Sequence, residues 1–208
     1  DNGVGALARF NLPSGITADS FGNLFVSDSN NDTIRKIDLQ GNVTTIAGLV
    51  GNHGSSDGNG ANARFSGPIG IAVDTSGNLF LADTRNSTIR KVDPQGNVTT
   101  IAGLAGTYGS DDGVGANARF NGLSGITADS SGNLFVADSD NRTIRKIDPQ
   151  GNVSTIAGLA GTPGSADENG ANARFYKPFG IAADSSGNLF VADRNNNTIR
   201  KVDPQGNV

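Results

Sequence analysis

Residues 22–48 read GNLFVSDSNNDTIRKIDLQGNVTTIAG, and this stretch decides the fold of the chain. It contains three short apolar or β-branched runs, at 24–27, 33–37 and 43–47, which are separated by glycine, asparagine and aspartate. Such runs favour strands, and the residues between them favour turns. A similar run lies just before, at 15–19. We therefore expect four consecutive strands, named A to D in chain order, joined by short connections.

The whole chain repeats this pattern. The tripeptide Ala8-Arg9-Phe10 returns every 55 residues, at 63–65, 118–120 and 173–175, with no insertion or deletion between copies. The copies occupy approximately residues 1–55, 56–110, 111–165 and 166–208, and the last one stops at the counterpart of Val43. A period of this kind indicates that each copy is one supersecondary unit that stacks on its neighbours.

Four antiparallel strands in a unit of this length predict a blade of a β-propeller. Neighbouring blades cover both faces of a blade, so the blade tolerates a mostly apolar strand such as 134–137. We predict an all-β fold in which residues 1–208 form a single propeller domain or propeller segment of four 55-residue blades. The fourth blade lacks most of its outer strand. A two-stranded solenoid fits the strand count less well.

Several motifs in each copy resemble those of the bacterial NHL-repeat β-propellers. They are Gly-Asn-Leu-Phe-Val-Ala-Asp, Asn-x-Thr-Ile-Arg-Lys-x-Asp and Gly-Asn-Val-Thr-Thr-Ile-Ala-Gly, and the resemblance extends over residues 1–208. It implies the propeller fold and leaves the function open, because these propellers include protein-binding modules, RNA-binding domains and a few enzymes such as amidating lyases. The family usually closes six blades. The resemblance therefore implies a fragment of a longer propeller, a compact four-bladed ring, or a ring or polymer of several chains.

The composition excludes several kinds of site. With no cysteine among 208 residues, disulfides, Cys-ligated zinc and thiol nucleophiles are excluded, and the single His53 excludes a multi-histidine metal site such as an amidating lyase needs. The net charge of −4 argues against a phosphate-backbone binder, since that affinity rests on clustered lysine and arginine. No apolar run is long enough to span a membrane. Because the chain begins at Asp1 and contains no methionine, we expect a processed or truncated piece.

One face of the predicted propeller varies from blade to blade. A four-stranded meander places the A–B and C–D turns on one face and the B–C and D–A connections on the other. The turns hardly change between copies, which indicates a structural role, whereas the connections differ in every copy and carry the acidic excess. We expect binding there, with the acidic excess favouring cations or basic partners. The candidate residues are Asn31, Asp32, Arg85, Tyr108, Asp140, Arg142, Tyr176, Lys177, Phe179 and Arg194.

The acidic residues that recur in every copy have a structural interpretation. Asp28 and its counterparts at 83, 138 and 193 are expected to accept backbone hydrogen bonds at the end of strand B or to pair with the recurring arginine. The stretch 110–113, with 56–58 and 167–168, offers oxygen ligands for Ca²⁺ but lacks the alternating spacing of an ion loop. We therefore predict no catalytic residue, no metal ligand and no cofactor, with calcium as the less favoured alternative.

The sequence predicts a non-catalytic protein-binding or assembly module that uses the variable face. One alternative is a self-assembling extracellular structural subunit of a filament or ring, because open blade edges and an unfinished fourth blade invite another chain. Another is a metal-dependent hydrolase or lyase with its ion at the propeller axis. The expected partners are proteins, including further copies of the chain, without nucleic acid or membrane insertion. A cysteine-free surface rich in Thr, Asn and Gly is typical of a bacterial secreted or cell-surface protein.

Overall fold

The structure, a computed structural model, describes every residue from Asp1 to Val208 and consists of four antiparallel sheets. In each of the first three blades the chain runs from the inner strand outward in sequence order. Blade 1 contains β2 (Pro13–Ala18), β3 (Leu24–Asp28), β4 (Thr33–Ile37) and β5 (Asn42–Gly48). Blade 2 contains β7 (Pro68–Val73), β8 (Leu79–Asp83), β9 (Thr88–Val92) and β10 (Asn97–Ala102). Blade 3 contains β12 (Leu123–Ala128), β13 (Leu134–Asp138), β14 (Thr143–Ile147) and β15 (Asn152–Ala157).

Blade 4 is a three-stranded sheet, as predicted. It contains β16 (Pro178–Ala183), β17 (Leu189–Asp193) and β18 (Thr198–Val202). Where the fourth strand would run, Asn207 forms an isolated antiparallel bridge with Asn169. The strand predicted at 33–37 coincides with β4, and the other strands of blade 1 differ from their predicted bounds by one or two residues at either end.

The segment before each inner strand contributes an additional element that the sequence analysis treated as a connection. Short strands lie along the outer edge of their own blades, with Gly3 opposite Val43 and Gly113 opposite Val153. These strands are β1 (Gly3–Val4), β6 (Gly58–Asn59) and β11 (Gly113–Val114). A single 3₁₀ turn follows each of these strands, and in blade 4 one follows the equivalent residue Asn169. These turns are η1 (Gly5–Leu7), η3 (Gly60–Asn62), η5 (Gly115–Asn117) and η6 (Gly170–Asn172). The first three blades therefore have five strands each, not four.

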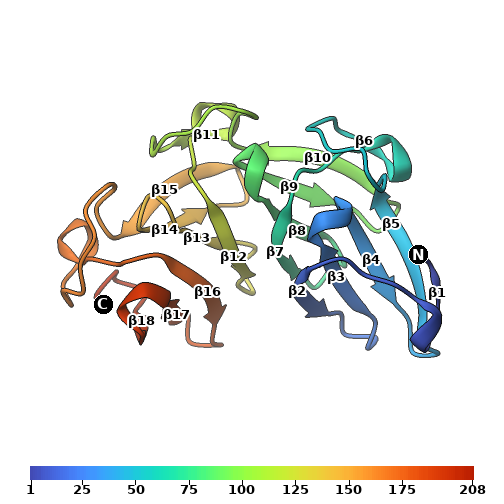
Figure 1. Cartoon of the computed structure of the whole chain (residues 1–208). Helices are drawn as coiled ribbons and strands as arrows, with labels where there is room; N and C mark the ends of the chain where they lie inside the picture. Colours follow the sequence, from blue (N-terminus) through green and yellow to red (C-terminus); the bar gives the residue numbers. More distant parts are fainter.

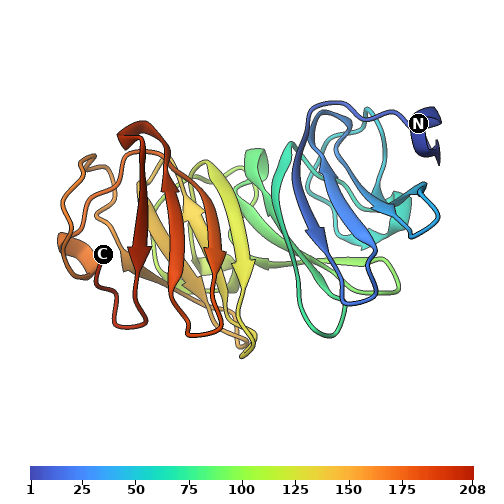
Figure 2. The ribbon, with the colours of Figure 1, turned by 90° about the horizontal axis from the view of Figure 1, so that it is seen from below.

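The four blades form an open arc around a common axis (Figure 1). The inner strands β2, β7, β12 and β16 follow one another around this axis, while the blades fan outward from it. Blades 1 and 4 lie at the two ends of the arc and do not pack face to face, because Ile16 and Ile199 on their facing sides are 63% and 72% exposed. The view from below (Figure 2) shows the same separation between the first blade and the last.

A glycine in each inner strand permits the blades to approach closely at the axis. A Cβ atom at Gly70 would lie 2.1 Å from the Ser124 carbonyl oxygen of the next blade, and one at Gly15 would lie 2.2 Å from that of Ile69. No side chain fits at such a distance. The recurring Gly-Ile pair of the repeat is therefore set by packing between blades and not by a turn.

The hydrophobic core lies between the blades. The phenylalanine of the Ala-Arg-Phe tripeptide is fully buried in blades 2, 3 and 4, where it packs against the preceding blade. Phe65, for example, belongs to a cluster with Phe25, Ile34 and Ala47 of blade 1. This interleaving explains why the tripeptide repeats without variation. No helix is long and apolar enough to cross a membrane.

Candidate functional site

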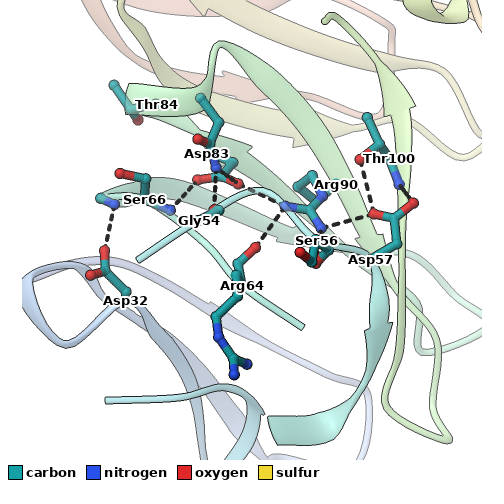
Figure 3. A network of polar contacts seen from close by, with 12 residues as sticks. Asp32, Gly54, Ser56, Asp57, Arg64, Ser66, Asp83, Thr84, Arg90 and Thr100 are labelled. Carbon is teal, nitrogen blue, oxygen red and sulfur yellow. Dashed lines mark hydrogen bonds and ion pairs between the residues drawn. The ribbon is translucent and has the colours of Figure 1, made fainter. Parts of the chain in front are cut away.

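A buried ion-pair network lies in every blade at the end of strand B, beside the variable loops, and Figure 3 shows the one in blade 2. The Arg90 guanidinium donates to the Asp83 carboxylate at 2.9 Å and to the Asp57 carboxylate at 2.8 Å. Asp83 also accepts the backbone N–H of Ser66 at 2.8 Å and the side-chain amide of Asn86 at 2.8 Å. Asp83 and Arg90 are fully buried.

The same contacts recur in the other blades. Asp28 accepts from Arg35 at 2.8 Å, Asp138 from Arg145 at 2.8 Å and Asp193 from Arg200 at 3.1 Å. The predicted structural role of these aspartates is confirmed, because each also accepts a backbone N–H near the start of its own inner strand. The network ties the second and third strands of a blade to the segment that enters it.

Burial sets the protonation chemistry of two of these carboxyls. It raises the pKa of Asp83 and of Asp138 to about 6, although the hydrogen bonds and the arginine act in the opposite direction. Each arginine also lies over the phenylalanine of its own tripeptide, as with Arg90 at 5.2 Å from the Phe65 ring centroid. Because the equivalent carboxyl of every blade is buried and paired with the arginine of that blade, these residues hold the blade together.

The turn face is uniform and is built of Asx turns. In the C–D turn of blade 2, Asp93 accepts the backbone N–H groups of Gln95 and Asn97 and the side-chain amide of Asn97. The hydrogen bond from the Asn97 side-chain amide has the largest effect, and together these bonds hold the pKa of Asp93 below its usual value. The same pattern closes the other turns of this kind. The geometry therefore explains why the turn sequences hardly vary.

Five of the predicted binding residues come together on the loop face of blades 3 and 4. The Lys177 ammonium forms an ion pair with Asp140 across the blade boundary, and the Arg194 guanidinium lies 5.4 Å from the centroid of the Phe179 ring. Tyr176 is adjacent, since its carbonyl oxygen accepts the backbone N–H of Asn195. Tyr176, Phe179 and Arg194 are exposed. These residues form what we call the loop cluster: Asp140, Tyr176, Lys177, Phe179 and Arg194.

The other five predicted residues lie apart from the loop cluster. Asp32 is buried, and its carboxylate accepts the backbone N–H of Gly67 at 2.7 Å, so it joins blades 1 and 2. Asn31 is half-buried and donates to Asp28 at 2.8 Å. Structural contacts therefore occupy both side chains. Arg85 is exposed on blade 2, Arg142 is half-buried on blade 3, and Tyr108 is exposed on the connection between them.

The charge of the variable segments is distributed differently from the sequence-based expectation. Asp57, Asp112 and Asp167, which belong to the acidic excess of the connections, each form an ion pair with the recurring arginine of their blade. The same arginine also binds the buried aspartate of that blade, so one negative charge remains in each of these networks. On the connections between strands B and C, Arg85, Arg142 and Arg194 form no ion pair. These B–C connections therefore present positive charge without an ion-pair partner, whereas the acidic excess expected from the sequence remains on the connections that precede the inner strands.

Several hollows mark the surface besides the loop cluster, and one of them, at the axis, borders its Phe179. An axial pocket of about 300 Å³ is lined by the inner strands, with Ile16, Ile71, Ile126 and Ile181 among its residues and no titratable side chain. A groove of about 530 Å³ crosses the turn face between blades 1 and 2 and includes the exposed Phe21. The sequence analysis did not select Phe21. The signal was present in the sequence, since the other three copies have serine at that position. Another hollow lies on the free side of blade 1.

No group of three or more His, Asp or Glu side chains gathers closely enough to hold a metal ion. The acidic stretches considered for Ca²⁺ have internal partners, since Asp57 binds Arg90 and Thr100, and Asp112 binds Arg145 and Thr155. Their carboxylates therefore take part in contacts between the outer strands and the network. The axis offers apolar side chains and backbone groups rather than ligands for the metal-dependent reaction considered above.

Comparison with known families agrees with this architecture. The NHL repeat family matches residues 65–92 and 175–202, which correspond to the same part of blades 2 and 4. The chain is an NHL-repeat β-propeller. NHL repeat-containing protein 2 of Bos taurus is 34% identical over 154 residues, which are 68% of this chain and 21% of that protein. The chain thus spans about a fifth of the length of this NHL relative.

Solved structures show the same fold at low sequence identity. An auxiliary nutrient binding protein of Bacteroides thetaiotaomicron superposes with a TM-score of 0.70 at 22% identity, covering 90% of this chain and 46% of that one. A catalytically inactive virginiamycin B lyase of Staphylococcus aureus, solved with quinupristin, gives a TM-score of 0.64 at 19% identity, covering 93% and 53%. The NHL chain thus shares its scaffold with a binding protein and with an enzyme, each about twice as long.

Proposed function

We propose that this NHL propeller is a non-catalytic protein-binding module and that the loop cluster is the centre of its binding surface. The observation that carries the proposal is the grouping of exposed Tyr176, Phe179 and Arg194 on an otherwise repeated scaffold. Aromatic residues and arginine supply most of the binding energy at protein interfaces. The groove of the turn face, which includes Phe21, has no arginine or tyrosine among its lining residues.

The internal contacts of the cluster support this role. The Lys177–Asp140 pair crosses from blade 4 to blade 3, so the cluster is placed by two blades at once. The ring of Phe179 is held beneath the Arg194 guanidinium, which leaves the guanidinium edge free to receive a carboxylate. With Arg85 and Arg142 also without an ion pair, the partner surface we expect is acidic with an apolar centre. A binding role at a secreted or cell-surface location remains part of the proposal.

A displayed library of random peptides tests the proposal. Peptides selected on the intact chain are expected to be rich in acidic and aromatic residues. They should bind the Tyr176→Ala/Arg194→Ala double variant at least about tenfold more weakly, since residues of these types dominate interfaces. Fluorescence anisotropy with labelled peptides measures the affinities. Tyr176 and Arg194 are exposed, so the double variant is expected to keep the fold.

The matched control places two alanines on the turn face. Ser131 and Gln150 are exposed there, and the Ser131→Ala/Gln150→Ala variant should bind the selected peptides as the unmodified chain does. If the peptides bind the loop-cluster variant unchanged, or lose affinity only for the turn-face variant, the proposed surface is wrong. A selection that enriches basic peptides would likewise contradict the expected acidic partner.

A further inference from the structure

The two ends of the blade arc present apolar faces that no other blade covers. On the free side of blade 1, a hollow of about 300 Å³ is lined by Phe10, Pro13, Ser14, Gly15, Ile16, Val26 and Ile37. On the free side of blade 4, Phe190 and Ile199 are exposed, and the space above Gly180 contains nothing within 4 Å except the Ala192 side chain of the same blade. We call these surfaces the blade-1 face and the blade-4 face.

Each free face has a covered counterpart inside the molecule. The apolar residues of the blade-1 face correspond to five residues of blade 3 that all lie in one core cluster with residues of blade 2: Phe120, Leu123, Ile126, Val136 and Ile147. The blade-4 face corresponds to Ala72, Ala82 and Ile89 of blade 2, which belong to the same cluster. The contact between blades 2 and 3 therefore brings together the same two kinds of surface that are free at the ends.

The repeat also has a longer period of two blades. Several positions alternate strictly between odd and even blades, and those in the inner strand and in strand C lie at the blade boundaries. The sets are Val4, Asn59, Val114 and Asn169; Thr17, Ala72, Thr127 and Ala182; Ile37, Val92, Ile147 and Val202. Serine occupies position 14 and position 29 in blade 1, and the same two positions in blade 3, but neither in blades 2 and 4.

The structure shows what the alternation does. Where an odd blade meets the following even blade, a serine hydroxyl reaches the next inner strand, as Ser29 does to the Pro68 carbonyl and Ser139 to the Pro178 carbonyl. Where even blade 2 meets odd blade 3, the Thr84 hydroxyl instead donates to the Ala82 carbonyl of its own blade at 3.2 Å. Apolar side chains of the core cluster form the contact between these two blades. There are thus two types of boundary, and each blade is built for one type on each side.

Blade 4 is an even blade and blade 1 is an odd one, so their free faces match the second type. If the blade-1 face of a second copy lay on blade 4 in the way that blade 3 lies on blade 2, a backbone carbonyl of its inner strand would lie over Gly180. In the covered case that carbonyl belongs to Ser124, and the corresponding residue of blade 1 is Ser14. Some positions differ from the covered contact: Pro13 takes the place of Leu123, and Phe179 and Arg194 take the places of Ile69 and Thr84. Residues 1–208 contain no counterpart of Ile101 and Ala102, so the equivalent contact is smaller at the outer strand.

We propose that a second copy of this chain docks its blade-1 face on the blade-4 face of the first. The contact continues the series of blade boundaries, burying Ile199 of one copy against Phe10, Ile16 and Ile37 of the other. The association is head-to-tail, because the two surfaces are different. Successive copies close a ring if the rotation between them permits, and otherwise extend a filament. This inference is argued from the free blade faces and shares only Phe179 and Arg194 with the loop cluster.

Complementary variants test the proposal on the intact chain. Ile16→Asp blocks the blade-1 face and Ile199→Asp blocks the blade-4 face; both residues are mostly exposed, so each variant should keep its fold, which circular dichroism and thermal unfolding check. By light scattering, the unmodified chain should exceed 21.1 kDa with increasing concentration, and each variant alone should stay at 21.1 kDa. An equimolar mixture should reach twice that mass and no more, because one intact face of each type remains.

The control is Leu104→Asp, a comparable substitution at an exposed leucine that follows β10, between blades 2 and 3 and away from the two ends of the arc. It should associate as the unmodified chain does. A chain that stays at 21.1 kDa at every concentration would overturn the proposal. Association of either blocked variant with itself would overturn it as well, because that requires two identical faces to pair. A mixture that stays monomeric, or a Leu104→Asp variant that no longer associates, would equally contradict it.

Discussion

Ile144 in blade 3 and Ile199 in blade 4 occupy the same position of the same Thr-Ile-Arg-Lys sequence, yet one is fully buried and the other is 72% exposed. The arginine that follows each of them is buried in both blades. The local sequence therefore decides the strand, the ion pair and the direction of each side chain. Whether the isoleucine lies in a core depends on the next blade.

This difference separates two kinds of stabilisation in the propeller. The Asp–Arg network lies within one blade and is complete in blade 4, whereas the isoleucine cluster lies between blades and is missing there. Interactions within a blade should contribute equally in every blade, and interactions between blades should contribute only where both partners are present. Repeat proteins divide their stability in this way between the repeat and its nearest neighbours.

The largest effect is expected from breaking the network. Arg145→Met leaves Asp138 buried without its cation, and the free energy of unfolding should fall by about 3–5 kcal/mol. Arg200→Met should cost a similar amount, because Asp193 is just as buried at the end of the arc. Urea unfolding measures both losses. In a double-mutant cycle, Asp138→Asn should recover part of the loss from Arg145→Met, and equal losses with and without the aspartate would contradict the pairing.

Truncating the isoleucine should give an unequal result in the two blades. Ile144→Ala removes a side chain from the core between blades 3 and 4, so the free energy of unfolding should fall by about 2–5 kcal/mol. Ile199→Ala should change it by less than about 0.5 kcal/mol in the monomer, as is usual for exposed positions. Urea unfolding of the monomer at low concentration makes the comparison. Losses of the same size would show that blade 4 is covered within a single chain.

The inner-strand glycine provides a steric version of the same contrast. A Cβ atom at Gly125 would lie 2.5 Å from the Phe179 carbonyl oxygen, whereas one at Gly180 would meet only the Ala192 Cβ at 3.7 Å. Gly125→Ala should therefore lower the free energy of unfolding by about 1–3 kcal/mol, as overpacking does. Gly180→Ala should leave the monomer unchanged or stabilise it by up to about 1 kcal/mol. Thermal unfolding measures both, and a destabilised Gly180→Ala monomer would contradict the open-arc arrangement.

The period of 55 residues was enough to predict the fold, because the copies agree in strand pattern and turn chemistry. The strand at 33–37 was placed to the residue, and the unfinished fourth blade was recognised from where the last copy stops. The outer strands β1, β6 and β11 were missed because each has two residues and no hydrophobic pattern. Their partner is the outer strand of the same blade, nearly 40 residues away, which local sequence does not reveal.

The candidate site was predicted less completely. Variation between copies selected Tyr176 and Arg194, which are exposed, but the same criterion selected Asp32 and Asn31, which are held by hydrogen bonds within the protein. A residue that differs between blades can serve the boundary between them, and sequence variation alone does not distinguish this from a ligand contact. Likewise, counting charges did not reveal that Asp57 is paired with Arg90. Only the arrangement in space assigns such partners.

The last contrast concerns pH and again separates two regions of a blade. The pKa of Asp138 is raised by burial to about 6, above the value of about 3.8 in the unfolded chain, so between these values the folded state binds more protons. Stability from this group is therefore fully present below pH 4 and is lost as the pH rises through 6. Asp148, on the turn face, has a pKa lowered by its Asn152 hydrogen bonds, and its contribution is lost only as the pH falls below about 4.

The pH ranges in which Asp138 and Asp148 affect stability do not overlap. Isosteric variants therefore distinguish the contribution of one aspartate from that of the other. Urea unfolding between pH 4.5 and 7 should show stability falling with rising pH, and Asp138→Asn should reduce this slope because the group can no longer titrate. Asp148→Asn should leave the slope unchanged over the same range, since Asp148 is ionised there in both the folded and the unfolded chain. If Asp138→Asn left the slope unchanged, the buried network would be ionised throughout, and the arginine would outweigh burial in setting its charge.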